Sequence, residues 1–314
     1  MRSVAVVAVF TLSTALRLPA QAPASFSTTP RLTGYFQPRF ETLGDSATFF
    51  LRRVRFAVEG NVTPWASYRA QIEMSTNGVG LVAAAPLAFS ATDVFIRLAH
   101  RAWGATVGQF KVPFSLESLL GASLLETSER SRIVNAAKRD IGVQADWTLA
   151  GRLVLQAALV DGEGPNRAVN PDNRMAYFAR AVVTPVKGLD LGGAFGGYSD
   201  SSGANVQGVY RAARWTARAE YIDEHNRRTP VHTRGWYGLA GYYAIPQRVE
   251  LVGRVEQFDP SNLVATDRST GYLIGLQYFM RGDNFKILAD YEAFREQAVQ
   301  VSNNRGVVQM QVRW

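Results

Sequence analysis

The sequence predicts an all-β fold, a 16-stranded antiparallel transmembrane β-barrel with a constriction loop after the fifth strand. Three observations predict it. Apolar and polar residues alternate with period two over most of the chain. The alternating runs approach or exceed the length of about 9 to 11 residues that a tilted membrane strand needs, well above the mean of about 5 to 6 in soluble domains. Short and long connections alternate between them, as in outer-membrane barrels.

The last segment shows the alternation most plainly. Val308, Met310 and Val312 alternate with Gln309 and Gln311. Turn signals divide the chain into sixteen such segments. We predict strands at 31–41, 48–61, 65–76, 89–102, 104–113, 139–149, 152–161, 175–186, 188–200, 204–213, 215–225, 234–245, 248–258, 270–280, 284–296 and 305–314.

The first residues have the composition of a secretory signal peptide. A short basic start at Arg2 precedes an apolar stretch, which ends before the small-x-small site formed by Ala20 and Ala22. An apolar stretch of about a dozen residues is too short for a spanning helix, which needs about 20. We therefore predict a signal peptide at 1–22, an outer-membrane barrel at 23–314, and localisation in the bacterial outer membrane.

Aromatic residues favour a membrane barrel over a soluble β-sandwich. Trp314 occupies the last position of the last strand, as outer-membrane assembly signals commonly do. Other aromatics recur near strand ends, as expected for the girdles at the two membrane interfaces. These residues are Trp65, Trp103, Trp147, Trp215, Trp236, Tyr237, Tyr242 and Tyr243.

The formal net charge is +8, and the basic residues are 30 Arg and only 4 Lys. They are spread along the chain instead of forming a run, which argues against a nucleic-acid partner. The alternation directs many of them inward, and in the first five strands they outnumber the acidic Glu59 and Glu73. Rings of basic residues bias a pore toward anions. The predicted pore-lining basic residues are Arg53, Arg55, Arg69, Arg97, Arg101, Lys111 and Arg218.

Two further expectations concern single side chains. Arg52 falls on the outer face, where its long side chain would reach the headgroups. In the later strands, opposite charges such as Arg254 and Glu256 are expected to pair and keep the wall soluble.

The longest connection runs from Phe114 to Lys138. A structureless loop of this length is usually functional, and we expect it to fold into the lumen as a constriction. Its charge is balanced. The candidate residues of the constriction are Glu117, Glu126, Glu129, Arg130, Arg132, Lys138 and the adjoining Arg139.

Over most of the mature chain, and most strongly from 48 to 161, the sequence resembles the phosphate-selective porin O and P family. The stretches that carry the resemblance are Phe50 to Gly60 with Tyr68 to Glu73, Val107 to Glu117, Arg139 to Gln144, and a weaker one at Ala217 to Tyr221. The resemblance implies a 16-stranded porin, usually trimeric, whose third external loop constricts the pore. It also implies phosphate or polyphosphate passing along an arginine ladder with a lysine at the constriction. This chain is shorter than the best-known members, and its loop has no dense run of lysines.

Little in the sequence suggests catalysis. The histidines are His100, His225 and His232, and only His225 has acidic neighbours, Asp223 and Glu224. There is no Gly-x-Ser-x-Gly element, and the absence of cysteine and of clustered histidines leaves no metal-ligand spacing. We expect no catalytic residues, no metal and no cofactor.

The predicted function is a water-filled diffusion pore with a preference for anions. The alternatives are a non-selective porin, and a non-conducting barrel that acts as a receptor or structural anchor. The pore is favoured because the inferred lumen lacks apolar residues that would plug it. The expected partners are the lipid bilayer, lipopolysaccharide, small anionic solutes and two further copies in a homotrimer.

Overall fold

The computed structural model describes residues 27–76, 87–134, 138–167, 169–198, 200–298 and 301–314. The predicted signal peptide at 1–22 and most of the predicted connection from Asn77 to Ala88 lie outside these residues. Among the described residues, no helix has the length and apolar character needed to cross a membrane.

Sixteen strands account for most of the described chain, and each end lies within three residues of the predicted one. The strands are β1 (Arg31–Leu43), β2 (Ser46–Thr63), β3 (Ala66–Thr76), β4 (Leu87–His100), β5 (Trp103–Lys111), β6 (Arg139–Leu149), β7 (Leu153–Val160), β8 (Ala176–Val186), β9 (Leu189–Tyr198), β10 (Ser201–Ala212), β11 (Trp215–Asn226), β12 (His232–Ile245), β13 (Val249–Asp259), β14 (Ser269–Phe279), β15 (Phe285–Glu296) and β16 (Arg305–Arg313). Two short helices, α1 (Leu116–Leu119) and the 3-10 helix η2 (Ala122–Leu124), lie between β5 and β6.

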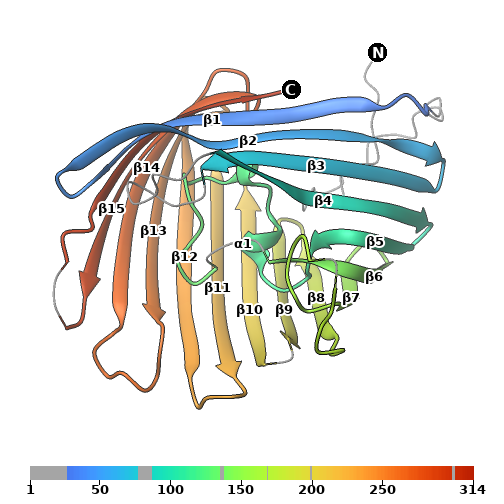
Figure 1. The fold of residues 1–314 in the computed structure, drawn as a ribbon. Helices are drawn as coiled ribbons and strands as arrows, with labels where there is room; N and C mark the ends of the chain where they lie inside the picture. Colours follow the sequence, from blue (N-terminus) through green and yellow to red (C-terminus); the bar gives the residue numbers. More distant parts are fainter. Residues whose placement is uncertain (1–26, 77–86, 135–137, 168, 199, 299–300) are drawn as a thin grey trace.

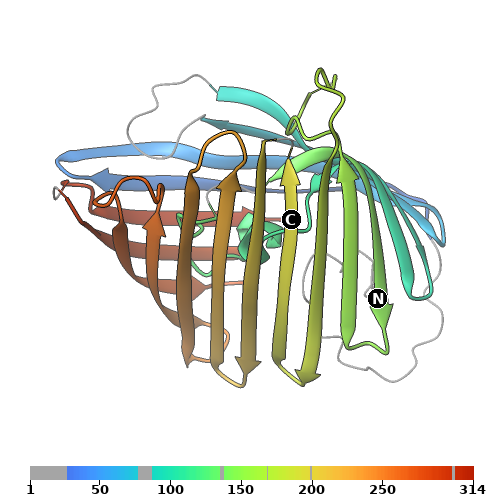
Figure 2. The ribbon, with the colours of Figure 1, turned by 90° about the horizontal axis from the view of Figure 1, so that it is seen from below.

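The strands form one closed antiparallel barrel in which each strand pairs with its neighbours in sequence. The first and last strands close it, with Tyr35 opposite Arg313 and Leu43 opposite Arg305. Figures 1 and 2 show the strands around a central space that contains α1. Closure matters because lipid offers no hydrogen-bond partner to an open strand edge. The predicted fold class is confirmed.

Side chains alternate between the two faces of the barrel, with polar residues inside. In β16, Gln309 and Gln311 are buried in the interior, whereas Val308 and Met310 are exposed on the outer face. This order is the reverse of that in a soluble barrel and suits lipid outside and water inside. Alternation of this kind also explains why the average composition of the chain resembles that of a soluble protein.

The connections differ from the predicted alternation at two places. β1 and β2 are joined by the tight turn of Gly44 and Asp45, and only two residues of sequence separate the end of β9 from the start of β10, although both connections lie at the end that carries the long loops. Gly44 has a φ of 55°, which suits a tight hairpin turn. At the opposite end β4 stops at His100. Arg101 therefore lies exposed in a turn with a φ of 52° and does not line the wall, contrary to the prediction.

Aromatic side chains form the expected girdle at the end with short turns. Trp103 stacks on Trp147 with ring centroids 4.7 Å apart, and Trp215 packs on Tyr242 at 4.6 Å. The assignment of Tyr237 and Tyr243 to the girdle was wrong. Each is an odd number of residues from the outward-facing Tyr242 on the same strand, so both side chains point inward. The Tyr237 hydroxyl lies 3.4 Å from Glu220 Oε2 inside the barrel.

Gly142 on β6 offers a direct test of the strand packing. A Cβ at this position would lie 2.2 Å from the Leu159 carbonyl oxygen and 2.6 Å from Val160 Cα, so backbone would have to move. We expect Gly142→Val to lower the free energy of unfolding by about 3 kcal/mol. Gly253→Val is the matched control, because a Cβ there meets no atom within 4 Å. Urea unfolding in lipid vesicles, followed by tryptophan fluorescence, measures both. Equal stability of the two variants would contradict the strand pairing described.

Candidate functional site

The segment from Val112 to Val134 lies inside the barrel and spans its lumen. It carries α1, and the N-cap residue of this helix is Ser115, whose Oγ accepts a hydrogen bond from the Ser118 amide. Glu220 on β11 anchors this helix by accepting hydrogen bonds from Ser115 Oγ at 3.1 Å and the Leu116 amide at 2.9 Å. On the other side, Gln311 on β16 donates to the Ser123 carbonyl oxygen at 3.0 Å.

Apolar side chains of this segment pack inside the lumen. Phe114 and Ile133 are buried in a cluster with Tyr237 and Leu239 of the wall. Leu120, Ala122 and Leu125 form a second cluster with Tyr35 of β1. The expectation that the lumen lacks apolar residues was wrong, because inward positions of the wall include leucine, valine and tyrosine as well as charged residues.

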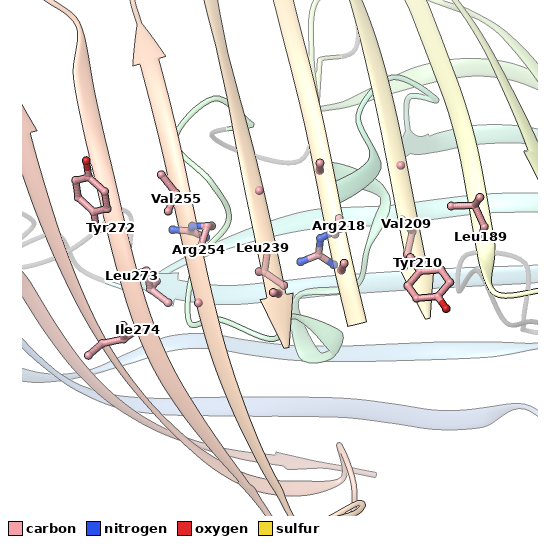
Figure 3. Close-up of a pocket in the computed structure, with 16 residues that line it drawn as sticks. Leu189, Val209, Tyr210, Arg218, Leu239, Arg254, Val255, Tyr272, Leu273 and Ile274 are labelled. Atoms are coloured by element: carbon pink, nitrogen blue, oxygen red, sulfur yellow. The ribbon is translucent and has the colours of Figure 1, made fainter. Parts of the chain in front are cut away.

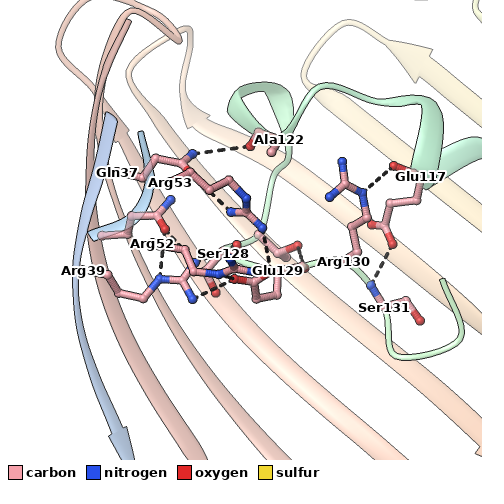
Figure 4. Close-up of polar contacts among 12 residues, drawn as sticks. Gln37, Arg39, Arg52, Arg53, Glu117, Ala122, Ser128, Glu129, Arg130 and Ser131 are labelled. Atoms are coloured by element: carbon pink, nitrogen blue, oxygen red, sulfur yellow. Dashed lines mark hydrogen bonds and ion pairs between the residues drawn. The ribbon is translucent and has the colours of Figure 1, made fainter. Parts of the chain in front are cut away.

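Glu129 is the centre of the charged contacts that hold this segment. Its carboxylate lies 2.8 Å from Arg39 Nη1, 2.5 Å from Arg52 Nε and 2.8 Å from Arg53 Nη2, as Figure 4 shows. Burial alone would raise the pKa of Glu129, but Arg53, Arg52 and Arg39 outweigh it and hold the pKa well below its ordinary value. The segment therefore carries a carboxylate that stays ionised among three guanidinium groups.

Arg52 reaches Glu129 because β2 contains a bulge. In the pairing of β1 with β2, Gln37 is opposite Arg53 but Pro38 is opposite Leu51, so Arg52 is the extra residue. A bulge of this kind turns two consecutive side chains toward one face. The expectation that Arg52 faces lipid was therefore wrong, and Arg39 on β1 is a member of the cluster that sequence reasoning missed.

The far wall binds the same segment through two more arginines. Arg218 on β11 lies 3.2 Å from Glu117 and 2.8 Å from Glu126. Arg254 on β13 pairs with Glu256 at 3.1 Å and Glu292 at 2.8 Å, and it donates to the Glu129 carbonyl oxygen at 2.8 Å. The expected pairing of Arg254 with Glu256 is confirmed. The segment is thus attached to opposite walls of the barrel.

Most basic residues of the early strands have a carboxylate partner. Arg55 lies 2.7 Å from Glu73, and Arg69 pairs with Glu59. The count of basic over acidic residues made from the sequence left out two acidic partners. Asp146 binds Arg97 through two hydrogen bonds of 2.7 and 2.8 Å, and Asp93 lies 2.8 Å from Arg139 Nε. The net basic surplus on this wall is therefore smaller than the sequence suggested.

Lys111 and Arg130 differ from these cations, because their hydrogen bonds go to backbone carbonyls. Lys111 Nζ donates to the carbonyl oxygens of Leu119 at 3.2 Å and Leu120 at 2.8 Å. Arg130 donates to the carbonyl oxygens of Glu117 at 2.9 Å and, like Lys111, Leu120 at 2.8 Å. Burial lowers the pKa of Arg130 to about 10. Within the described part of the chain, neither cation has a carboxylate at ion-pair distance.

The remaining predicted residues of the constriction lie toward the end with long loops. Arg132 lies 3.3 Å from Glu296 and stacks on Phe294, and Lys138 pairs with Glu224. Arg139, which was grouped with the loop, is the first residue of β6. None of these three groups belongs to the cluster around Glu129.

Two of the three histidines lie side by side near the end with long loops. His232 Nδ1 lies 3.3 Å from Asp223, while the ring of His225 lies beside that of His232 with centroids 4.3 Å apart. The described residues contain no group of three or more His, Asp and Glu side chains placed to hold a metal ion.

A closed 16-stranded barrel whose lumen is crossed by a charged loop is the architecture of an outer-membrane channel. The sequence matches the family described as phosphate-selective porin O and P over residues 33–228 and 194–314. The chain belongs to this family, which confirms the resemblance seen in the sequence and the location in the bacterial outer membrane. Family and fold are those of a channel rather than of an enzyme.

A curated relative gives less information. An uncharacterized protein of Caulobacter vibrioides is 28% identical over 255 residues, which are 74% of this chain and 48% of the relative. The chain thus spans about half the length of the curated relative that it matches.

Solved structures with a similar fold are outer-membrane proteins. The channel DcaP of Acinetobacter baumannii has a TM-score of 0.67 at 11% identity, covering 91% of this chain and 97% of that one. The trimer form of OmpT, an outer membrane protein of Vibrio cholerae, has a TM-score of 0.66 at 13% identity. The match covers 91% of this chain and 99% of the OmpT chain. An anion-selective porin from Comamonas acidovorans has a TM-score of 0.66 at 10% identity. The match covers 91% of this chain and 99% of the porin chain. At these identities the likeness shows the fold.

The depressed pKa of Glu129 predicts how loop attachment depends on pH. A carboxyl whose pKa is lowered by its partners stabilises the attached loop at every pH above its ordinary pKa of about 4.5. This stabilisation is lost as the pH falls from there through the lowered pKa. Because the chain has no cysteine, Leu124→Cys gives a single site for a spin label. We expect label mobility to be constant from pH 8 to about 4.5 and to rise below it.

Glu129→Gln should raise the mobility of the same label above about pH 4.5, and the difference from the parent should shrink at lower pH as Glu129 itself is protonated. Asp45→Asn, which removes an exposed carboxylate in the β1–β2 turn, is the control and should leave mobility unchanged. A label as immobile in Glu129→Gln as in the parent would show that Glu129 does not hold the loop.

Proposed function

We propose that this channel is a water-filled diffusion pore that prefers anions, with the segment 112–134 as its constriction. Lys111 and Arg130 are the cations that select the solute. The observation that carries this proposal is their hydrogen bonding to backbone carbonyls, which leaves both positive charges without a carboxylate at ion-pair distance among the described residues. Arg130 is partly exposed, so solutes can approach it.

Arginines that each have their own carboxylate contribute less to selectivity, because their charge is already balanced. Arg55, Arg97 and Arg218 are each bound to at least one carboxylate. A balanced pair has a weak field at the distance of a passing ion, whereas an unbalanced cation in a low-dielectric wall focuses its field into the lumen. Phosphate is the candidate solute suggested by the family description, since guanidinium groups bind its oxygens in a fork.

We further propose a homotrimer as the assembled form. One of the structures with a similar fold, OmpT of Vibrio cholerae, is described as a trimer form.

A non-conducting barrel is the second candidate, and the filled lumen favours it. Inward residues such as Arg39, Arg254 and Lys286 are almost completely buried, and the two apolar clusters occupy space that a wide pore would leave to water. Planar-bilayer recording distinguishes the candidates. A pore gives single-channel steps and a reversal potential on the anion side in a salt gradient, whereas an anchor gives no steps.

Removing the two unbalanced cations should lower the anion preference. A unit charge about 4 Å from an anion in water stabilises it by about 1 kcal/mol, which is about fivefold in partitioning. We therefore expect Lys111→Gln with Arg130→Gln to lower the chloride-to-potassium permeability ratio about fivefold or more.

The control removes a cation without changing the net charge. Arg97→Gln combined with Asp146→Asn deletes a balanced pair and should leave the permeability ratio near that of the parent. A fall in this control equal to that in the double variant would contradict the assignment of selectivity to Lys111 and Arg130.

A further inference from the structure

The outer face of β10 to β14 carries a groove of about 650 Å³. Its floor consists of small residues, including Ala217, Ala240 and Gly253, which are opposite one another in the strand register. Tyr210 on β10 stands at one side, and Tyr272 and Ile274 on β14 at the other, as Figure 3 shows. The groove lies between the aromatic residues of the two interfaces and therefore at the depth of hydrocarbon chains.

The glycines of this floor are not required by the packing of the barrel itself. A Cβ added to Gly238 or Gly253 would meet no atom within 4 Å, unlike one at Gly142. Their small size therefore serves the space outside the wall.

A cationic rim lies above the groove at the end with long loops. Arg234 and Arg268 share one carboxylate oxygen of Asp259, at 3.4 and 3.3 Å. Arg295 is exposed and lies over the ring of Tyr272, 5.9 Å from its centroid, with no carboxylate at ion-pair distance in the described chain. Three guanidinium groups thus face the headgroup region, with Asp259 between two of them and Asp223 opposite Arg234 in the strand register.

The strand register sets the distance between rim and floor. Arg234 and Ala240 lie on the same face of β12, six residues apart, which is about 20 Å along a strand. Arg295 is opposite Thr270 on β14, four residues from Ile274, or about 13 Å. This spacing matches a lipid whose phosphate sits at the interface and whose acyl chain runs down toward the bilayer centre.

We propose that this surface is a binding site for a phosphorylated, multiply acylated lipid of the outer leaflet, of which lipid A is the representative. One acyl chain occupies the groove, and Arg295, Arg234 and Arg268 bind a headgroup phosphate. The proposed lipid contacts are distinct from the lumenal ion pairs, because the small residues of the floor and the three rim arginines lie on the outer face. Arg218 and Arg254 line the wall beneath the groove, but their guanidinium groups bind carboxylates of the lumen. It does not depend on whether the channel prefers anions or conducts at all.

Ordinary annular lipid does not account for the combination of features. Apolar contact alone needs no unbalanced arginines, and an interfacial arginine needs no groove of small residues beneath it. The two together fit a ligand with both an anionic head and a chain of defined position. A second copy of the chain is the other occupant to be tested.

Retention of purified hexa-acylated lipid A tests the site. Folded protein is loaded with lipid A, exchanged into lipid-free detergent, and analysed by native mass spectrometry. We expect the parent to retain lipid A and to retain phosphatidylethanolamine much less. In Ala240→Leu the larger side chain fills part of the groove, so we expect lipid A retention to fall. Displacing a single acyl methylene would already lower the affinity about fourfold. Arg295→Gln, which leaves the groove intact, should lower retention about fivefold.

Ala181→Leu is the matched control, because Ala181 is exposed on the outer face of β8 outside the groove. Arg152→Gln is the control for loss of charge, because Arg152 lies in the turn between β6 and β7, at the end with short turns. Both should retain lipid A like the parent, and circular dichroism confirms that each variant is folded. Parent-like retention in both Ala240→Leu and Arg295→Gln would overturn the proposal. So would equal retention of the two lipids, or a change of oligomer size in Ala240→Leu without loss of lipid A.

Discussion

The rest of the structure depends on one constraint, that backbone hydrogen bonds in lipid must be satisfied within the protein. The sheet therefore closes, with β1 paired to β16, and alternate side chains must face lipid or lumen. Apolar residues take the lipid side, so the charged residues of sixteen strands are collected inside. Charges gathered in a partly buried space need counter-charges or water, and the loop between β5 and β6 supplies the counter-charges.

Loop and wall are consequently parts of one electrostatic system. Glu129 forms ion pairs with three guanidinium groups on one wall, and Glu117 and Glu126 bind Arg218 on the other. Losing one partner of a buried pair is costly, because the remaining charge stays desolvated. The loop is thereby held at a fixed place, and the two cations that it does not neutralise, Lys111 and Arg130, define where the proposed selectivity acts.

Local patterns in the sequence predicted the strands but not how neighbouring strands meet. Period-two alternation located all sixteen strands, because each long strand repeats the signal many times. A single bulge shifts the alternation by one residue, and only the pairing of β1 with β2 reveals it, so Arg52 was placed on the wrong face. The arginine partners of Asp93 and Asp146 lie on other strands, so no local sequence spacing predicts these ion pairs. The path of the loop depends on such long-range contacts as well.

The central claim is that the loop is already fixed against the wall in the working channel. Gln37 Nε2 lies 3.5 Å from the Ala122 carbonyl oxygen, and both residues are buried. Replacing them in the cysteine-free chain by Gln37→Cys and Ala122→Cys, and adding a short bis-maleimide, measures their proximity during bilayer recording. The account predicts rapid cross-linking with unchanged single-channel conductance. Failure to cross-link, or a several-fold change in conductance when the link forms, would contradict it.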